Sequence, residues 1–181
     1  TPSTPYDAKG LLKSAIRDDD PVVFLEHKRT YRLVKGEVPD EEYTLPIGSA
    51  DIKRRGNDIS VITYGLMVHH CLEAAQAVVA EGIEVEVLDL RTVRPIDDKA
   101  IVQTAIKTGK VIIVHEDSKA LGVGAEVSAI VSEHAFEYLD GPVTRLAGPE
   151  VPAMPFSPPM EAMYMIDSAK IATAIRKLAA Y

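Results

Sequence analysis

The middle and end of the chain alternate between short apolar runs and stretches in which apolar residues recur at helical spacing. The apolar runs predict four strands, at residues 58–65, 84–91, 110–117 and 141–148. The spaced stretches predict helices at residues 67–81, 98–108, 122–136 and 168–181. Runs such as residues 111–114 are apolar on both faces, which is typical of parallel strands covered by helices on both sides. We therefore expect an α/β domain with a mostly parallel sheet.

The start of the chain has a different pattern. Residues 7–17 predict a helix whose first turn Asp7 caps, and residues 22–28 predict a buried strand. One helix and one strand cannot bury their own apolar surface. Residues 1–28 are therefore expected to be the tail of an earlier domain, so that the chain starts in the middle of a protein.

A linker is predicted for residues 29–57, because this stretch is rich in charge, proline and glycine and shows no sustained period. The linker divides the chain at about residue 57. Residues 58–181 are then expected to form the second domain.

Composition narrows the classes of function. The 181 residues carry a formal net charge of −7, which argues against non-specific nucleic-acid binding. The single cysteine, Cys71, cannot form an internal disulfide, which favours a reducing compartment. No apolar stretch reaches eighteen residues, and the first twenty lack a signal-peptide pattern, so we expect a cytoplasmic protein without membrane contact.

Three ionisable residues, His115, Glu116 and Asp117, follow one another at the carboxyl end of the third predicted strand. Sites in open α/β sheets form at the carboxyl ends of strands. A histidine beside two carboxylates can act as a proton shuttle, or the three can form a hydrogen-bonded cluster that orders the next loop. The residues alone leave both interpretations open.

Two glycines in the stretch 121–126 precede the helix predicted after this strand. They can bring a phosphate close to a helix N-terminus, or they can allow the helix to pack closely on the sheet. The third glycine of a dinucleotide motif is absent, with Val127 in its place.

A second polar group, His69, His70 and Cys71, lies within a predicted helix. Adjacent helical residues face different directions, so these three cannot share a metal ion. Cys71 falls on the apolar face and is expected to pack in the core.

The segment Ala15–Pro21 ends the first predicted helix with three consecutive aspartates. Carbonyl groups at a helix C-terminus and nearby carboxylates suit a hard cation such as potassium or calcium, although a solvated acidic turn has the same composition. No complete catalytic set of residues is evident in the chain.

Several segments together resemble the β subunit of the thiamine-diphosphate-dependent 2-oxo acid dehydrogenases, and the resemblance covers the whole chain. The segments are PSTPYDAKGLLKSAIRDDDPVVFLEHKRTYR, LPIGSADIKRRGNDISVITYG, VEVLDLRTVRPID, KTGKVIIVHED, GAEVSAIVSEHAF and RLAGPEVPAMPF. The stretch LAGPEVPAMPFSPPMEAMYM looks more similar to the branched-chain type than to the pyruvate type, which remains the alternative.

The resemblance implies a fold and a reaction. Residues 58–181 look like the transketolase C-terminal domain, a five-stranded, mostly parallel sheet with one antiparallel strand and helices on both faces. Residues 1–28 look like a remnant of the pyrimidine-binding domain. The reaction implied is oxidative decarboxylation with acyl transfer to the lipoyl group of an acyltransferase core, using thiamine diphosphate and magnesium.

The same resemblance implies that the catalytic residues lie elsewhere. The family's activating glutamate and its histidine would both precede Thr1, so residues 1–181 are expected to contain no catalytic or cofactor-binding residue. The chain alone is therefore expected to be inactive. The family assembles as an α2β2 tetramer, which implies an α subunit and a second β subunit as partners.

Two further sites follow from the resemblance. A partial potassium site is expected at Ala15, Asp18 and Asp20, the positions that match the family's helix end. Glu137 and Asp140 are expected to dock the basic subunit-binding domain of the acyltransferase core. A non-catalytic docking or assembly module is the alternative from another class of function.

Overall fold

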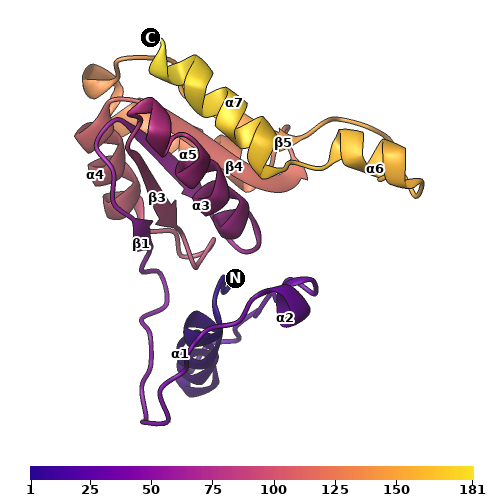
Figure 1. Ribbon diagram of the computed structural model, residues 1–181. Coiled ribbons are helices and arrows are strands. Elements are labelled where there is room, and N and C mark those ends of the chain that lie inside the picture. Colours follow the sequence, from indigo (N-terminus) through magenta and orange to yellow (C-terminus); the bar gives the residue numbers. More distant parts are fainter.

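A computed structural model describes all residues, 1–181 (Figure 1). The helices are α1 (Pro5–Arg17), α2 (Thr30–Leu33), α3 (Met67–Ala77), α4 (Asp98–Thr108), α5 (Val123–His134), α6 (Pro158–Tyr164) and α7 (Ser168–Ala179). The strands are β1 (Asp51–Arg54), β2 (Ile59–Thr63), β3 (Val85–Asp89), β4 (Val111–Ser118) and β5 (Thr144–Gly148). Two short 3₁₀ turns complete the list, η1 (Val79–Glu81) and η2 (Phe136–Tyr138). None of these helices has the length and hydropathy of a membrane span.

The five strands form one sheet in the order β1-β3-β2-β4-β5. Strands β2 to β5 are mutually parallel, and only β1 runs antiparallel, against β3. In the centre of the sheet, Val61 of β2 lies opposite Val87 of β3 on one side and Ile112 of β4 on the other. This topology confirms the expected mostly parallel α/β fold with one antiparallel strand.

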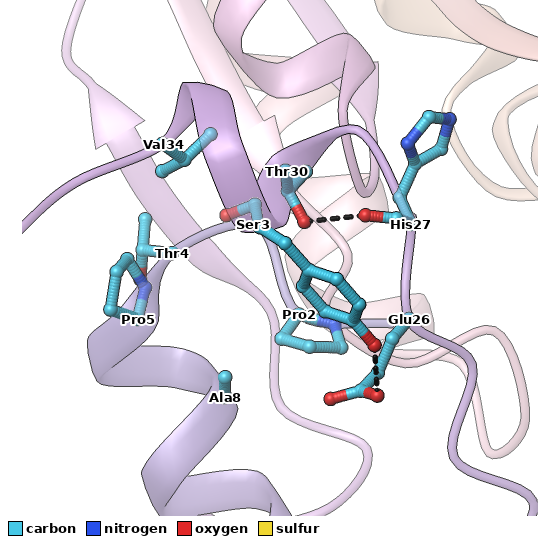
Figure 2. A pocket seen from close by; sticks show the side chains of 10 residues that line it. Pro2, Ser3, Thr4, Pro5, Ala8, Glu26, His27, Thr30 and Val34 are labelled. Atoms are coloured by element: carbon cyan, nitrogen blue, oxygen red, sulfur yellow. Dashed lines mark hydrogen bonds between the residues drawn. The ribbon is translucent and has the colours of Figure 1, made fainter.

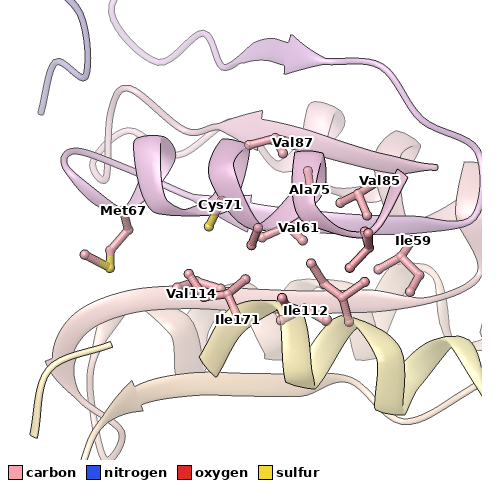
Figure 3. Packing of buried hydrophobic residues seen from close by; sticks show 14 of the residues in the cluster. Ile59, Val61, Met67, Cys71, Ala75, Val85, Val87, Ile112, Val114 and Ile171 are labelled. Carbon is pink, nitrogen blue, oxygen red and sulfur yellow. The ribbon is translucent and has the colours of Figure 1, made fainter. Parts of the chain in front are cut away.

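Both faces of the sheet are covered by helices, and each face has its own apolar core. Helices α3 and α7 pack together over one face, and Figure 3 shows the side chains between them and the strands. That core contains 17 buried residues, among them Ile59, Val61, Cys71, Ile112 and Ile171. Helices α4 and α5 cover the opposite face with 11 buried residues. Strands buried on both sides explain why the sequence shows continuous apolar runs.

The ends of the helices follow local capping chemistry. Asp97 accepts a hydrogen bond from the backbone N–H of Ala100 at the start of α4, and Asp167 accepts one from that of Lys170 at the start of α7. Helix α1 is different, because Thr4 rather than Asp7 is its N-cap residue. The predicted role of Asp7 as a cap is wrong: its carboxylate is fully buried and belongs to a cluster of charged groups.

Two predictions for the start of the chain are corrected by the structure. Residues 22–28 form no strand, and Val23 is 83% exposed, because no other strand lies beside this segment to pair with it. Residues 51–54 lie within the predicted linker and yet form β1. The sheet therefore begins before residue 57. We call residues 48–181 the sheet domain and residues 1–47 the N-terminal unit.

Candidate functional site at the carboxyl ends of the strands

Strands β2 and β4 are neighbours, but the chain continues from β2 to β3 on the other side of β2. Their carboxyl ends therefore flank a topological switch point, where open α/β sheets form crevices. A cavity of about 240 Å³ lies there. Residues 64–67 after β2 and Glu116 and Asp117 of β4 form one wall, and Leu25, Glu26 and His27 of the N-terminal unit form another. We call this cavity the crevice.

His115, Glu116 and Asp117 are not brought together as a proton shuttle. His115 is 1% exposed, and neither of its ring nitrogens has a hydrogen-bond partner. Its ring is parallel to that of Tyr64, with centroids 6.5 Å apart. Glu116 instead contacts His27, with 2.8 Å between Oε2 and Nε2. Asp117 is exposed, and its carboxylate accepts the N–H of Ser118.

Burial, followed by nearby charge, shifts the pKa values of Tyr64 and His115 at the crevice. Burial, and then the nearby carboxylates of Asp117 and Glu116, raise the pKa of Tyr64 to about 12. Burial lowers the pKa of His115, the Asp117 carboxylate partly opposes this effect, and Arg145 adds to it. At neutral pH the crevice therefore presents carboxylates beside a neutral phenol, with a neutral imidazole buried behind them.

The two glycines at the start of α5, the N-cap Gly122 and Gly124 of the first turn, pack against His115. A β-carbon on Gly122 would lie 2.7 Å from the ring carbon Cε1, and one on Gly124 would lie 2.5 Å from Cδ2. These contacts support the interpretation that the glycines allow close packing of the helix. Nothing in their geometry requires a phosphate.

A second cavity, of about 200 Å³, lies between the start of α1 and α2 (Figure 2). Two hydrogen bonds order its rim: Thr30 Oγ1 donates to the carbonyl of His27 at 2.6 Å, and Tyr31 donates to Glu26 at 2.5 Å. Figure 2 shows the His27 ring pointing away from this cavity. The same residues, Glu26 and His27, thus separate this cavity from the crevice.

A buried group of charges joins the N-terminal unit to the sheet domain. Lys53 Nζ lies 2.6 Å from Asp7 and 2.8 Å from Asp51, and Arg91 lies 2.8 Å from Asp7 and 2.9 Å from Asp51. Asp89 is the fifth member, 3.8 Å from Lys53. We call these five residues the ion cluster. It places the start of α1 directly against strands β1 and β3.

The pKa values within the ion cluster reflect competition between burial and pairing. Burial alone would raise the pKa of Asp7, but hydrogen bonds from Lys53 and Thr4 hold it below its ordinary value. Burial would lower the pKa of Lys53, but hydrogen bonds to Asp51 and Asp7 raise it. For Asp89 burial prevails and raises the pKa, although Ser3 donates a hydrogen bond to its carboxylate at 2.5 Å.

The strand order and the helix pairs have counterparts among known proteins. The family model for the transketolase C-terminal domain matches residues 48–171, more than half of the chain. The chain belongs to the transketolase C-terminal domain family. The match begins just before β1 and ends within α7, so it lies inside the sheet domain.

Relatives of this transketolase C-terminal domain protein include three bacterial β subunits. The 2-oxoisovalerate dehydrogenase subunit beta of Bacillus subtilis is 58% identical over 99% of this chain and 55% of its own length. The pyruvate dehydrogenase E1 component subunit beta of the same organism is 54% identical over 86% and 48%. The acetoin:2,6-dichlorophenolindophenol oxidoreductase subunit beta of Cupriavidus necator is 47% identical over 97% and 52%. The chain thus spans about half the length of the relatives it matches.

A solved structure, a split gene transketolase in an inactive beta4 tetramer, gives a TM-score of 0.77 at 24% identity. The structural match covers 99% of this chain and 56% of the transketolase chain, and it supports the fold described above. The sequence similarity confirms the resemblance to β subunits of 2-oxo acid dehydrogenases.

The residues expected to hold potassium lie outside the transketolase C-terminal domain. Ala15 is in the last turn of α1, Asp18 is the C-cap residue, and Asp20 follows in an exposed turn. The backbone N–H of Asp20 donates to the Asp18 carboxylate at 3.0 Å. The three residues therefore share one helix end, and their role remains a prediction.

The residues expected to dock a basic partner lie on the transketolase C-terminal domain itself. Glu137 in η2 and Asp140 just after it are both exposed. The backbone N–H of Asp140 donates to the carbonyl of Gly109 at 2.7 Å, which fixes this turn on the end of α4. Phe136 and Tyr138, 72% and 53% exposed, flank Glu137.

Sequence reasoning identified the switch-point residues of β4 but missed the ion cluster. Its members come from α1, β1, β3 and the turn after β3, and no local pattern connects them. It also missed the pairing of His27 with Glu116. The prediction that Cys71 packs in the core is confirmed, since its side chain is fully buried, and burial raises the pKa of the thiol.

Proposed function

We propose that this chain is the C-terminal portion of the β subunit of a thiamine-diphosphate-dependent 2-oxo acid dehydrogenase, acting on branched-chain 2-oxo acids. The observation that carries this proposal is the 58% identity to a 2-oxoisovalerate dehydrogenase β subunit over 99% of the chain. The pyruvate-type relative is 54% identical over 86% of the chain, which makes pyruvate the second candidate substrate.

In this proposal the sheet domain serves assembly, and the residues that act on the substrate lie outside residues 1–181. The crevice does not suit a diphosphate, because its lining includes three carboxylates, those of Glu26, Glu116 and Asp117. Thiamine diphosphate and magnesium would therefore be held by other parts of the β subunit and by an α subunit. Their chemistry is the decarboxylation of the 2-oxo acid.

The N-terminal unit fits the role of a domain tail. Leu11 is the only large apolar side chain that the N-terminal unit buries. Its exposed apolar side chains include Ile16, Val23, Leu25, Tyr31 and Leu33. Apolar surface of this extent normally faces another part of a protein. We propose that it packs against the remainder of a pyrimidine-binding domain, and that the ion cluster fixes that domain relative to the sheet.

The substrate is tested by producing the full β subunit together with its α subunit. The decarboxylation rates of 2-oxoisovalerate and pyruvate are compared at equal cofactor saturation, with residues 1–181 alone as the control. Faster turnover of 2-oxoisovalerate and an inactive control are expected. Preference for pyruvate would contradict the branched-chain assignment, and activity of residues 1–181 alone would contradict the assembly role.

Potassium is proposed to bind at the end of α1 through Ala15, Asp18 and Asp20. The support is their position at a helix C-terminus, where backbone carbonyls lack partners within the helix. Potassium is then expected to raise the melting temperature of the full enzyme more than sodium at equal ionic strength. Equal melting temperatures in the two salts would contradict the site.

We further propose that Glu137 and Asp140 dock the subunit-binding domain of an acyltransferase core. Their support is exposure on one turn, beside two exposed aromatic rings that can supply apolar contact. The Glu137→Gln/Asp140→Asn double variant of the assembled enzyme is expected to bind this basic domain more weakly, while Glu161→Gln on α6 binds normally. Affinity that is equal at low and high salt would contradict charge-based docking.

A further inference from the structure

His115 is a buried polar side chain whose position the assembly role does not explain. Its ring is 1% exposed, and both of its nitrogens lack hydrogen-bond partners. Buried polar groups are normally paired, so an unpaired imidazole calls for a physical reason. The ring lies between Tyr64, which follows β2, and the first turn of α5, where Gly122 and Gly124 contact it.

This surrounding leaves one N–H of the neutral ring unpaired and disfavours the protonated ring more strongly. An imidazolium would need acceptors for two N–H groups, and the structure offers none. The ring also contacts the N-terminal end of a 12-residue helix, where the helix dipole is positive. Burial and the Arg145 guanidinium act in the same direction and lower the pKa of the ring.

The charges that favour protonation are poorly placed to stabilise it. Glu116 is paired with His27, and Asp117 is exposed at the end of the strand. The first turn of α5 has one acidic residue, Glu126, and its side chain is also exposed. From β2 the neighbour is Tyr64, whose own pKa is raised to about 12, so it stays neutral.

The loop over the ring, residues 118–122, is held in a strained conformation. Leu121 has a φ of 59° and is fully exposed, which is unusual for a bulky residue. The loop is held by the N–H of Lys119, which donates to Gly148 at 3.0 Å, and by Arg145, which donates to the Lys119 carbonyl at 2.8 Å. If the loop moves away from the ring, water reaches the imidazole and the strain at Leu121 is relieved.

We propose that His115 is a proton-sensitive latch for the loop of residues 118–122. The neutral ring holds the loop and the first turn of α5 against the sheet, and the protonated ring releases them. The adjacent Glu116 contacts the N-terminal unit, and Lys119 contacts the end of β5. Release of the loop would therefore loosen two connections of the sheet domain at once.

The size of the effect follows from proton linkage. An exposed imidazole has a pKa of about 6.5. If only the open loop binds the proton, the open population rises about tenfold between pH 7.5 and pH 5.5. The open population of the loop is thus expected to be lowest at neutral pH and to grow on mild acidification.

Hydrogen exchange on the intact protein tests the latch. Protection of residues 117–124, corrected for intrinsic exchange, is measured at pH 7.5 and 5.5, with α3 as the internal reference. We expect about a tenfold loss of protection in the loop, none in α3, and no pH effect in His115→Gln. His134→Gln, at the exposed end of α5, is the matched control and should keep the tenfold loss. A pH response that persists in His115→Gln would overturn the proposal.

An NMR titration of the unsubstituted protein supplies a test that needs no variant. The His115 ring is expected to titrate below its ordinary pKa of about 6.5, in step with the amide signals of residues 118–122. A ring that titrates while those amide signals stay unchanged would overturn the latch, whatever the stability of His115→Gln.

Discussion

The sheet domain and the N-terminal unit are held in place by different forces. The sheet domain buries two apolar clusters, of 17 and 11 residues, on the two faces of one sheet. In the N-terminal unit the buried residues are Pro2, Ser3, Asp7, Gly10 and Leu11. The unit is joined to the sheet through the ion cluster and the contact of His27 with Glu116. The stability of an apolar core depends little on charge and pH, whereas the stability of the ion cluster and of the His27–Glu116 contact depends on both.

The largest expected effect comes from truncating one apolar side chain in each region and comparing the losses of stability. Ile112→Ala removes a fully buried side chain near the start of β4 and is expected to lower the free energy of unfolding by about 4 kcal/mol. Ile16→Ala, at a position of α1 that is 75% exposed, is the control and should change it by less than about 0.5 kcal/mol. Urea denaturation measures both. Equal losses would show that α1 is as well packed as the sheet.

The second prediction concerns a variant that disrupts the ion cluster. Lys53→Met leaves Asp7 and Asp89 buried without this partner and is expected to weaken attachment of the N-terminal unit by about 3 kcal/mol. The readout is faster amide exchange in α1 with α3 unchanged. Lys13→Met, which removes a surface pair with Glu42, is the control and should have no measurable effect. Unaltered exchange in α1 after Lys53→Met would show that the ion cluster does not hold the unit.

The third prediction uses two glycines, one in each region. Gly124→Ala places a methyl group 2.5 Å from Cδ2 of His115 and is expected to destabilise the sheet domain by about 2 kcal/mol. Gly36→Ala meets only Pro5 at 3.5 Å, so it should be neutral. Thermal unfolding of the two variants distinguishes them, and equal melting temperatures would mean that the contact of α5 with His115 is loose.

The fourth prediction compares two N-cap residues. Asp167→Ala removes the cap of α7, which belongs to the larger core, and should lower the global free energy of unfolding by about 1 kcal/mol. Thr4→Ala removes the cap of α1 and should speed amide exchange only within α1. A global loss from Thr4→Ala would show that the two regions unfold as one unit.

The smallest expected effect is acid release of the N-terminal unit. Asp7 has a lowered pKa in the folded state, so its contribution is complete above its ordinary pKa of 3.8 and is lost as the pH falls through the lowered value. Asp89 has a raised pKa and contributes in the opposite direction, which reduces the net effect. Exchange in α1 should increase below pH 3.8, and Asp7→Asn should flatten that increase. If exchange in α1 still increases to the same extent at low pH in Asp7→Asn, protonation of another group causes the increase.

The sequence predicted the parts of the fold where burial leaves a local period. Strands β2 and β3 and the first five residues of β4 are buried throughout, so their apolar runs stand out, whereas the edge strand β5 is only partly buried. Strand β1 is an edge strand of three charged residues and Ile52, so it has no apolar period to detect. The run at residues 22–28 looked like a strand because a local pattern cannot show whether a neighbouring strand is present.

The candidate site was predicted in position and not in arrangement. Side chains alternate along a strand, so His115 faces inward while Glu116 faces the crevice. That alternation was available from the sequence and argues against a three-residue proton shuttle. The ion cluster was not available, because Asp7, Lys53 and Arg91 meet only through the folded path of the chain.

The position of α7 has a consequence for synthesis of the chain. Its residues Ile171, Ile175 and Leu178 complete a core that also contains Ile59, more than a hundred residues earlier. While the ribosome is still making α6, helix α3 alone covers that face of the sheet. Nascent chains at this stage expose an apolar surface to which chaperones can bind, and they become fully protected only after α7 has emerged.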